Sequence, residues 1–144
     1  MTHDELVQII SAFIGTIGFG ILFNLRGNRL VFASIGGFLS WLLFILFNMF
    51  VRSDVVIYFI VALIISLYAE IMARILKTPT TTFITTSLIP LIPGGSLYYT
   101  MTSAFDSNIE LFVEKGIYTL ELASALALGI IIATTLTKIV CKIK

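Results

Sequence analysis

The chain has 144 residues, of which 58% are hydrophobic and only 12% are charged, and its mean hydropathy is +1.07. A soluble domain carries about 25% charged residues, so this composition excludes the soluble fold classes and indicates an integral membrane protein. The net charge is +1 without a basic patch, which argues against a nucleic-acid partner. One cysteine and one histidine can form neither an internal disulfide nor a Cys/His metal cluster, and we expect no metal and no cofactor.

Five apolar runs predict an all-α bundle of about five transmembrane helices in one domain. They cover residues 6–25, 30–51, 55–76, 80–104 and 117–140, and a polar loop at 106–115 precedes the last run. The N-terminus is acidic and has neither the basic start nor the cleavage site of a secretory signal. We therefore expect the first run to be retained as a span.

Small residues spaced by four predict that several of these helices pack closely, because small side chains let helix backbones approach in lipid. Trp41 lies in the middle of the second run. We expect it either to pack against a neighbouring helix or to reach a cavity for its N–H. The small-residue sets are Ala12, Thr16 and Gly20; Ala33 and Gly37; and Ala125, Gly129 and Ala133.

The third run places Glu70 and Arg74 on one helix face, together with hydroxyl and small residues. Glu four residues before Arg is the favourable order for an intrahelical ion pair. Two interpretations stay open. Either the two side chains pair near the membrane surface with Arg74 extended toward water, or Glu70 couples transport to protons with Arg74 as its partner, because ionisable groups within spans commonly mark proton and substrate paths.

The fourth run is interrupted by the sequence PLIPGG at 90–95. Proline has no N–H and its ring collides with the carbonyl four residues earlier, so Pro90 frees the carbonyl of Thr86 and Pro93 frees that of Ile89. Unpaired backbone groups are costly in lipid, so such a break persists only within protein or beside a water-filled cavity. At ~1.5 Å per residue it lies about 15 Å from Thr80, near the middle of a ~30 Å hydrocarbon layer.

We expect this break to be a substrate site. After it, Ser96 is predicted to cap a second half-helix, whose first-turn N–H groups and positive dipole end can hold a carboxylate. Before it, carbonyl and hydroxyl groups can hold a polar or cationic part of the substrate. The alternative for the threonines is that their hydroxyls only bond to their own helix. The candidate residues are Thr85, Thr86, Ile89, Pro90, Pro93, Gly94, Gly95, Ser96 and Tyr98.

Charge sorting predicts the topology, because basic residues near span ends favour the cytoplasmic side. Five crossings place most basic residues on one side and the acidic loops on the other. This predicts an external N-terminus, a cytoplasmic C-terminus and a fourth run that fully crosses the cell (inner or plasma) membrane. The basic residues on the cytoplasmic side are Arg26, Arg29, Arg74, Lys77, Lys138, Lys142 and Lys144.

Three stretches resemble the small subunit of the threonine/serine exporter family. They are GFGILFN at 18–24, AEIMARI at 69–75 followed by Thr78-Pro79, and IPLIPG at 89–94 followed by Tyr98. The resemblance covers essentially the whole chain. It implies a half-transporter that matches the C-terminal half of longer fused exporters, with a larger membrane subunit as its partner. It also implies export of threonine and serine or, as in a related two-subunit system, of succinate.

The leading hypothesis is therefore one subunit of a secondary transporter that exports small carboxylate-bearing metabolites with a larger membrane partner. Two alternatives stay open: a structural subunit that stabilises a partner carrying the whole site, and a subunit of a gated channel. A homo-oligomer is expected if no larger partner exists. An intramembrane enzyme is disfavoured, because no catalytic pair of carboxylates, His cluster or Ser/His arrangement occurs at helical spacing within the spans.

Overall fold

The computed structural model describes residues 3–106 and 108–142, and these residues form helices and the turns between them, with no strand among them. The all-α membrane class is therefore confirmed. Ser107, in the predicted polar loop, and Lys144, in the basic tail, lie outside the described residues. The elements are α1 (His3–Leu22), α2 (Asn28–Asn48), α3 (Asp54–Ile75), α4 (Thr80–Leu88), the 3-10 helix η1 (Ile89–Leu91), α5 (Gly94–Phe105) and α6 (Ile109–Lys142).

Among the described residues, four helices are long and apolar enough to cross a membrane: α1, α2, α3 and α6. The first three agree with the predicted spans to within three residues at each end. The fourth predicted span is divided into α4, η1 and α5, which have 9, 3 and 12 residues. The Pro/Gly sequence thus breaks the fourth segment where it was predicted to.

Left-handed residues end two of the spanning helices. Asn24 has φ 59° after α1, and Lys77 has φ 49° after α3. In each turn the next N–H folds back onto the helix: Leu25 N–H donates to the Gly20 carbonyl, and Thr78 N–H donates to the Ala73 carbonyl, both at 2.9 Å. This pattern satisfies carbonyls that a helix end otherwise leaves without a donor.

The start of α6 corrects the predicted span and loop. The helix begins at Ile109 rather than at 117, so most of the predicted loop at 106–115 is helical. Asn108 explains the difference, because its side-chain oxygen accepts the Leu111 N–H at 3.1 Å and caps the first turn. Glu110 adds a favourable negative charge in that turn. With 34 residues, α6 is about 51 Å long, which exceeds a ~30 Å hydrocarbon layer.

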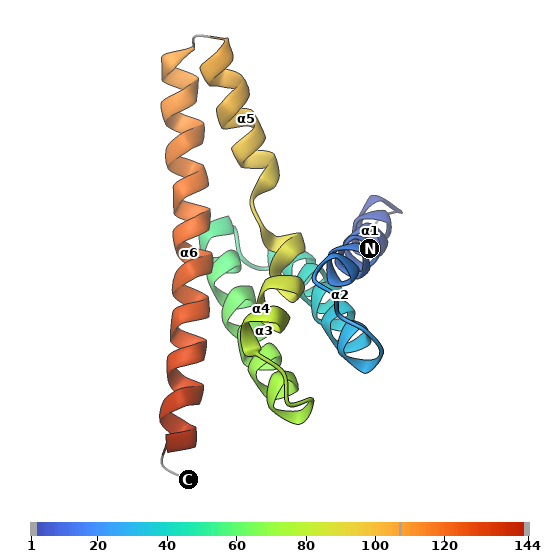
Figure 1. The fold of residues 1–144 in the computed structure, drawn as a ribbon. Helices are drawn as coiled ribbons and strands as arrows, with labels where there is room; N and C mark the ends of the chain where they lie inside the picture. Colours follow the sequence, from blue (N-terminus) through green and yellow to red (C-terminus); the bar gives the residue numbers. More distant parts are fainter. Residues whose placement is uncertain (1–2, 107, 143–144) are drawn as a thin grey trace.

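The helices form a bundle with a projecting hairpin (Figure 1). α1 packs on α2, α4 packs on both α2 and α3, and the later part of α6 packs along α3. α5 runs beside the first half of α6, and together they extend past the ends of α1 to α3. The break between α4 and α5 is therefore the point where the chain leaves the bundle for the hairpin.

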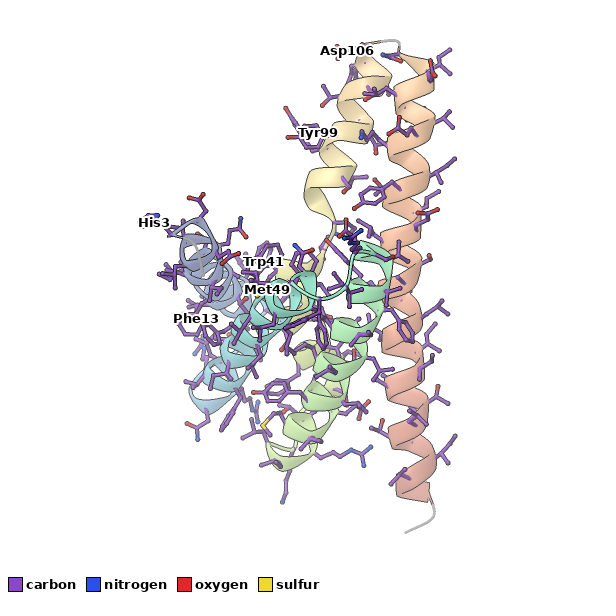
Figure 2. All side chains as sticks on the ribbon, turned by 180° about the vertical axis from the view of Figure 1, so that it is seen from behind. His3, Phe13, Trp41, Met49, Tyr99 and Asp106 are labelled. Carbon is purple, nitrogen blue, oxygen red and sulfur yellow. The ribbon has the colours of Figure 1, made fainter. Side chains whose placement is uncertain are left out.

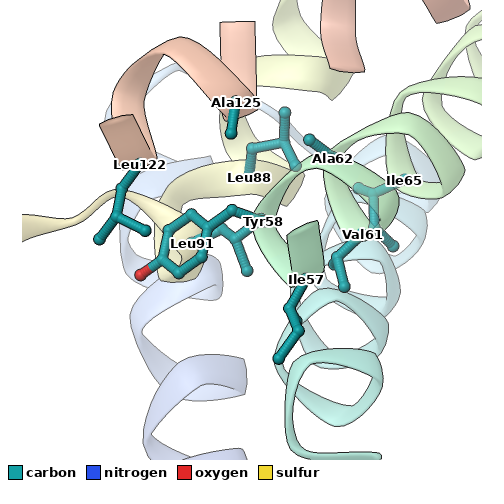
Figure 3. Packing of buried hydrophobic residues seen from close by; sticks show 9 residues of the cluster. All are labelled: Ile57, Tyr58, Val61, Ala62, Ile65, Leu88, Leu91, Leu122 and Ala125. Atoms are coloured by element: carbon teal, nitrogen blue, oxygen red, sulfur yellow. The ribbon is translucent and has the colours of Figure 1, made fainter. Parts of the chain in front are cut away.

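The largest apolar core lies between α3, α6 and the end of α4 (Figure 3). Lipid tails are as apolar as these side chains, so close packing, rather than exclusion of water, holds the helices together. Leu91 of η1 is fully buried and lies beside Tyr58 and Leu122, which anchors the break to α3 and α6. The buried members are Ile57, Tyr58, Val61, Ala62, Ile65, Leu88, Leu91, Leu122 and Ala125.

Small residues make the closest helix contacts, as predicted. Gly129 of α6 lies against α3 so tightly that an added Cβ would be 2.8 Å from both the Ala62 Cβ and the Phe59 carbonyl oxygen. Gly37 of α2 faces Thr16 of α1, where an added Cβ would be 2.6 Å from the threonine methyl. These contacts set the spacing of the α3/α6 and α1/α2 pairs.

Candidate functional site

The break consists of one 3-10 turn and a short extended step. α4 ends at Leu88, η1 follows, Ile92 is extended (φ −61°, ψ 126°), and α5 starts at Gly94. The carbonyl of Ile89 accepts the Ile92 N–H at 3.2 Å, so the prediction that Pro93 leaves this carbonyl free is wrong. The tighter 3-10 turn supplies a donor one residue earlier than an α-helix would. The Thr86 carbonyl still loses its usual donor, because Pro90 has no N–H.

The break is displaced from the middle of the bundle. α4 begins beside Glu70, five residues before the end of α3, and η1 reaches Tyr58, four residues after the start of α3. Measured along α3, the break is about 6 Å from the Asp54 end and about 25 Å from the Ile75 end. The midplane estimate assumed that the segment starts at the membrane surface, whereas α4 starts about 8 Å inside the end of α3.

The two candidate threonines lie in different environments. Both hydroxyls donate to their own helix, Thr85 to the Thr81 carbonyl at 2.7 Å and Thr86 to the Thr82 carbonyl at 2.8 Å. As donors, these hydroxyls therefore bond only to their own helix, as the alternative interpretation predicted. Each hydroxyl oxygen can still accept a hydrogen bond. Thr86 is fully buried, whereas Thr85 is exposed on the surface of this chain.

The N-terminus of α5 is open. Gly94 and Gly95 are exposed, and a Cβ added to either would meet nothing within 4 Å. Ser96 does not cap this helix, contrary to the prediction: it is the third helical residue, and the Pro93 carbonyl accepts the Leu97 N–H at 3.0 Å. The Gly95 and Ser96 N–H groups belong to the first turn, which has no acceptor within its own helix.

Tyr98 and Tyr99 lie on the exposed side of α5. Tyr98 is 67% exposed, and its ring packs edge-on against that of Tyr99, with 5.7 Å between centroids. Tyr99 points away from α6 (Figure 2). The role of Tyr98 as a donor beside the break therefore stays a prediction that depends on a group outside this chain.

The second candidate site is a buried carboxylate. Glu70 is only 6% exposed, and its Oε2 lies 3.5 Å from Arg74 Nη2 and 3.5 Å from the Thr80 hydroxyl. Arg74 Nη2 also donates to the Thr137 carbonyl of α6 at 3.4 Å. The predicted ion pair forms, with Glu70 buried and the Arg74 side chain 43% exposed.

Glu70 thus lies at the N-terminus of α4, since Thr80 is the first residue of that helix. The preceding residue, Pro79, makes no side-chain hydrogen bond that caps α4. A carboxylate at this end is favoured by the helix dipole. α4 has nine residues, which separates Glu70 from the break by about 13 Å, so the two sets of candidate residues do not form one cluster.

Two cavities involve residues that the sequence did not single out. One, of about 300 Å³, is lined by Val7, Gln8, Ser11, Ala12, Trp41 and Pro90. The other, of about 260 Å³, is lined by Phe23, Thr81, Thr82 and Thr85. Trp41 lines the first cavity, which is one of its two predicted environments, and its ring stacks on Phe44 of its own helix, α2, with 5.0 Å between the ring centroids. Its indole N–H is buried and has no acceptor among the described residues.

A comparison with protein families decides the wider class. The family model described as "Threonine/Serine exporter, ThrE" matches residues 8–136. The chain belongs to the threonine/serine exporter family. The resemblance of the three sequence stretches to this family is thereby confirmed, and the match includes the break, Glu70 and nearly all residues lining both cavities.

Membership in the exporter family, together with the four apolar spanning helices, assigns the chain to a membrane location and to transport of the amino-acid export type. Comparisons with curated proteins and with solved structures found no match.

Proposed function

We propose that this exporter-family chain is one subunit of a secondary transporter that exports small carboxylate-bearing metabolites, such as threonine and serine or a dicarboxylate. The observation that supports this role best is the break in the fourth segment. Broken helices in transporters present a positive helix end to an anionic group. Here that end carries two exposed glycines with open space around them, so a ligand carboxylate can approach the backbone.

The open glycines also support a partner subunit. Among the described residues, α5 packs on α6 and leaves Leu97, Tyr98 and Tyr99 more than half exposed. A transporter site at this end needs a second wall, because lipid cannot satisfy a substrate carboxylate. We propose that a larger membrane subunit of the same family supplies this wall and completes alternating access.

Glu70 is the proposed coupling residue. It is buried, it faces one cation, and it changes its charge when it takes up a proton. Carboxylates in such positions commonly belong to proton relays. Arg74 holds the charged form in place and links it to α6 through the Thr137 carbonyl.

For orientation, we propose an external N-terminus and a cytoplasmic C-terminus, which the basic residues of the turns after α1 and α3 support. An alkaline phosphatase fused to the N-terminus should be active outside the cytoplasm. Inactive fusions at normal membrane levels would contradict this orientation and place the N-terminus in the cytoplasm.

Gly94→Leu tests the proposed function. The Cβ of the new side chain has no atom of this chain within 4 Å, and Gly94 is exposed, so the subunit should insert and fold normally. We expect efflux of threonine from loaded cells that express both subunits to fall at least about tenfold, because the leucine blocks approach to the α5 N–H groups. Leu128→Phe, at a position of α6 that is 53% exposed, is the control for added bulk on a surface away from the break.

Unchanged efflux with Gly94→Leu at normal membrane levels would remove the break from the mechanism. Full transport by the partner alone would instead favour the structural role for this chain. Flux that does not saturate with substrate and ignores a proton gradient would favour a channel.

A further inference from the structure

The two cavities lie at opposite ends of one seam, where α1 runs antiparallel to the fourth segment. At one end, Phe23, just after α1, meets Thr81, Thr82 and Thr85 of α4. At the other end, the first turns of α1 meet Pro90 of η1. Thr82 and Pro90 are eight residues apart, so the cavities are separated by about 12 Å along the seam.

Between the cavities, Gly20 of α1 lies next to Thr86 of α4. Gly20 and Thr86 are both buried there, and a Cβ added to Gly20 would be 3.7 Å from the Thr86 methyl. The seam therefore has an opening at each end and a constriction of small and hydroxyl-bearing residues in the middle.

The lining of both cavities is polar in places and carries no charge. The hydroxyls of Thr81, Thr82 and Thr85 line one cavity, and the Gln8 amide and Ser11 hydroxyl line the other. The Thr86 carbonyl, which lacks its helical donor, lies in sequence between the residues that line the two cavities. Trp41 adds a buried N–H that lacks an acceptor among the described residues. An apolar surface made only for lipid needs none of these groups.

We infer that the solute crosses along the α1–α4 seam, with the two cavities as its inner and outer stations and Gly20–Thr86 as the closed gate. The inference rests on the proposed function and adds the route that the solute takes through this subunit. It also places the partner's second wall over α1 and α4 rather than over the α3/α6 pair. Because the residues of this chain that line the two cavities carry no charge, the route suits a net-neutral zwitterion better than a dianion, which would enter a low-dielectric path without a counter-charge.

Cysteine labelling tests the route. In a Cys141→Ser background, with the partner co-expressed, Ser11→Cys and Thr82→Cys each place a thiol in one cavity at little change in volume. Ile131→Cys, on the exposed face of α6 and 57% exposed in this chain, is the control for lipid-facing positions. A charged methanethiosulfonate reagent reacts with thiols that water reaches, and membrane vesicles allow its addition from either side.

We expect both cavity positions to react and the control position to remain unlabelled. L-Threonine at about ten times its Kd should slow labelling at both positions about tenfold by occupancy, and succinate should not. Labelling of both positions no faster than Ile131→Cys would overturn the route. So would labelling that threonine does not slow in a pair that exports threonine. Slowing by succinate would overturn the preference for a zwitterion.

Failure of the proposed function gives a different result. If the unmodified pair exports neither threonine nor succinate, the transport proposal fails, while the labelling of Ser11→Cys and Thr82→Cys still decides whether water enters the seam.

Discussion

Gly129→Ala should destabilise the chain, although alanine is the better helix former. In a helix interior, replacing glycine by alanine is worth about 1 kcal/mol in favour of the variant. At Gly129 the new methyl would lie 2.8 Å from the Phe59 carbonyl oxygen and 3.0 Å from the Leu63 nitrogen, which are backbone atoms of α3. They cannot rotate away, so α6 itself must shift.

Overpacking of this kind costs about 1–3 kcal/mol, and the contact with backbone favours the upper part of that range. The net effect is then about 1–2 kcal/mol of lost stability. Gly116→Ala on the same helix is the matched control, because its methyl would meet only the Thr100 methyl at an ordinary 3.6 Å. That variant should gain up to about 1 kcal/mol from helix propensity.

Thermal unfolding in detergent or nanodiscs measures both changes. At roughly 4 °C per kcal/mol, Gly129→Ala should lower Tm by about 4–8 °C and Gly116→Ala should raise it by up to about 4 °C. Equal Tm values for the two variants would refute the reasoning, because they would show that α6 does not approach α3 at Gly129 as closely as the structure indicates.

Three further predictions concern single polar contacts. Glu70→Gln keeps an acceptor for Thr80 but removes the negative charge, so threonine efflux should lose its response to a proton gradient. Glu110→Gln, on the exposed first turn of α6, should keep that response. A retained response in Glu70→Gln would exclude this coupling role. Tyr118→Phe removes the hydroxyl that donates to the Asp54 carboxylate between α6 and α3. In a double-mutant cycle with Asp54→Asn, the coupling free energy of unfolding should be about 1–2 kcal/mol. Additive effects would show that the contact contributes nothing. Asn108→Ala should speed amide hydrogen exchange in the first turn of α6 about fivefold, because the cap is worth about 1 kcal/mol, and should leave the exchange rates of α3 unchanged. Slow exchange throughout α6 would show that the cap is dispensable.

The spans and the break were predictable because their signals are local. Charged turns end the apolar runs, and proline removes a donor whatever surrounds it. The close-packing face of Ala125, Gly129 and Ala133 was also visible, since small residues at a spacing of four have one main use in lipid. All three are buried in the structure.

The errors came from competition between local signals. The charges at 110, 114 and 115 suggested a loop, yet a capped helix accommodates them, and the Lys115 and Glu114 side chains are 40% and 67% exposed. Ser96 resembled a cap, but the backbone turn at Pro93 placed the cap three residues earlier and supplied its carbonyl instead. Capping preference is about 1 kcal/mol, which a proline-directed turn easily outweighs.

The cavities were not predictable, because they depend on which helices meet. Gln8 and Ser11 look like ordinary polar positions near the end of a span. They acquire meaning only when Pro90, about 80 residues later, is placed opposite them. Trp41 gave the one usable signal, since an indole N–H in the middle of a span needs an acceptor.

The position of Glu70 connects the proposed coupling residue to the proposed route. The carboxylate contacts Thr80, and the next two residues of α4, Thr81 and Thr82, line the cavity that also includes Phe23. When Glu70 takes up a proton, the negative charge that favours the N-terminus of α4 is lost, and that end of the helix is held less firmly. In the proposed mechanism, the helix that forms one side of the seam is therefore also the helix whose N-terminus contacts the proposed coupling residue. Coupling by this geometry needs no long-range relay, because one rigid nine-residue helix joins the carboxylate to the cavity and to the break.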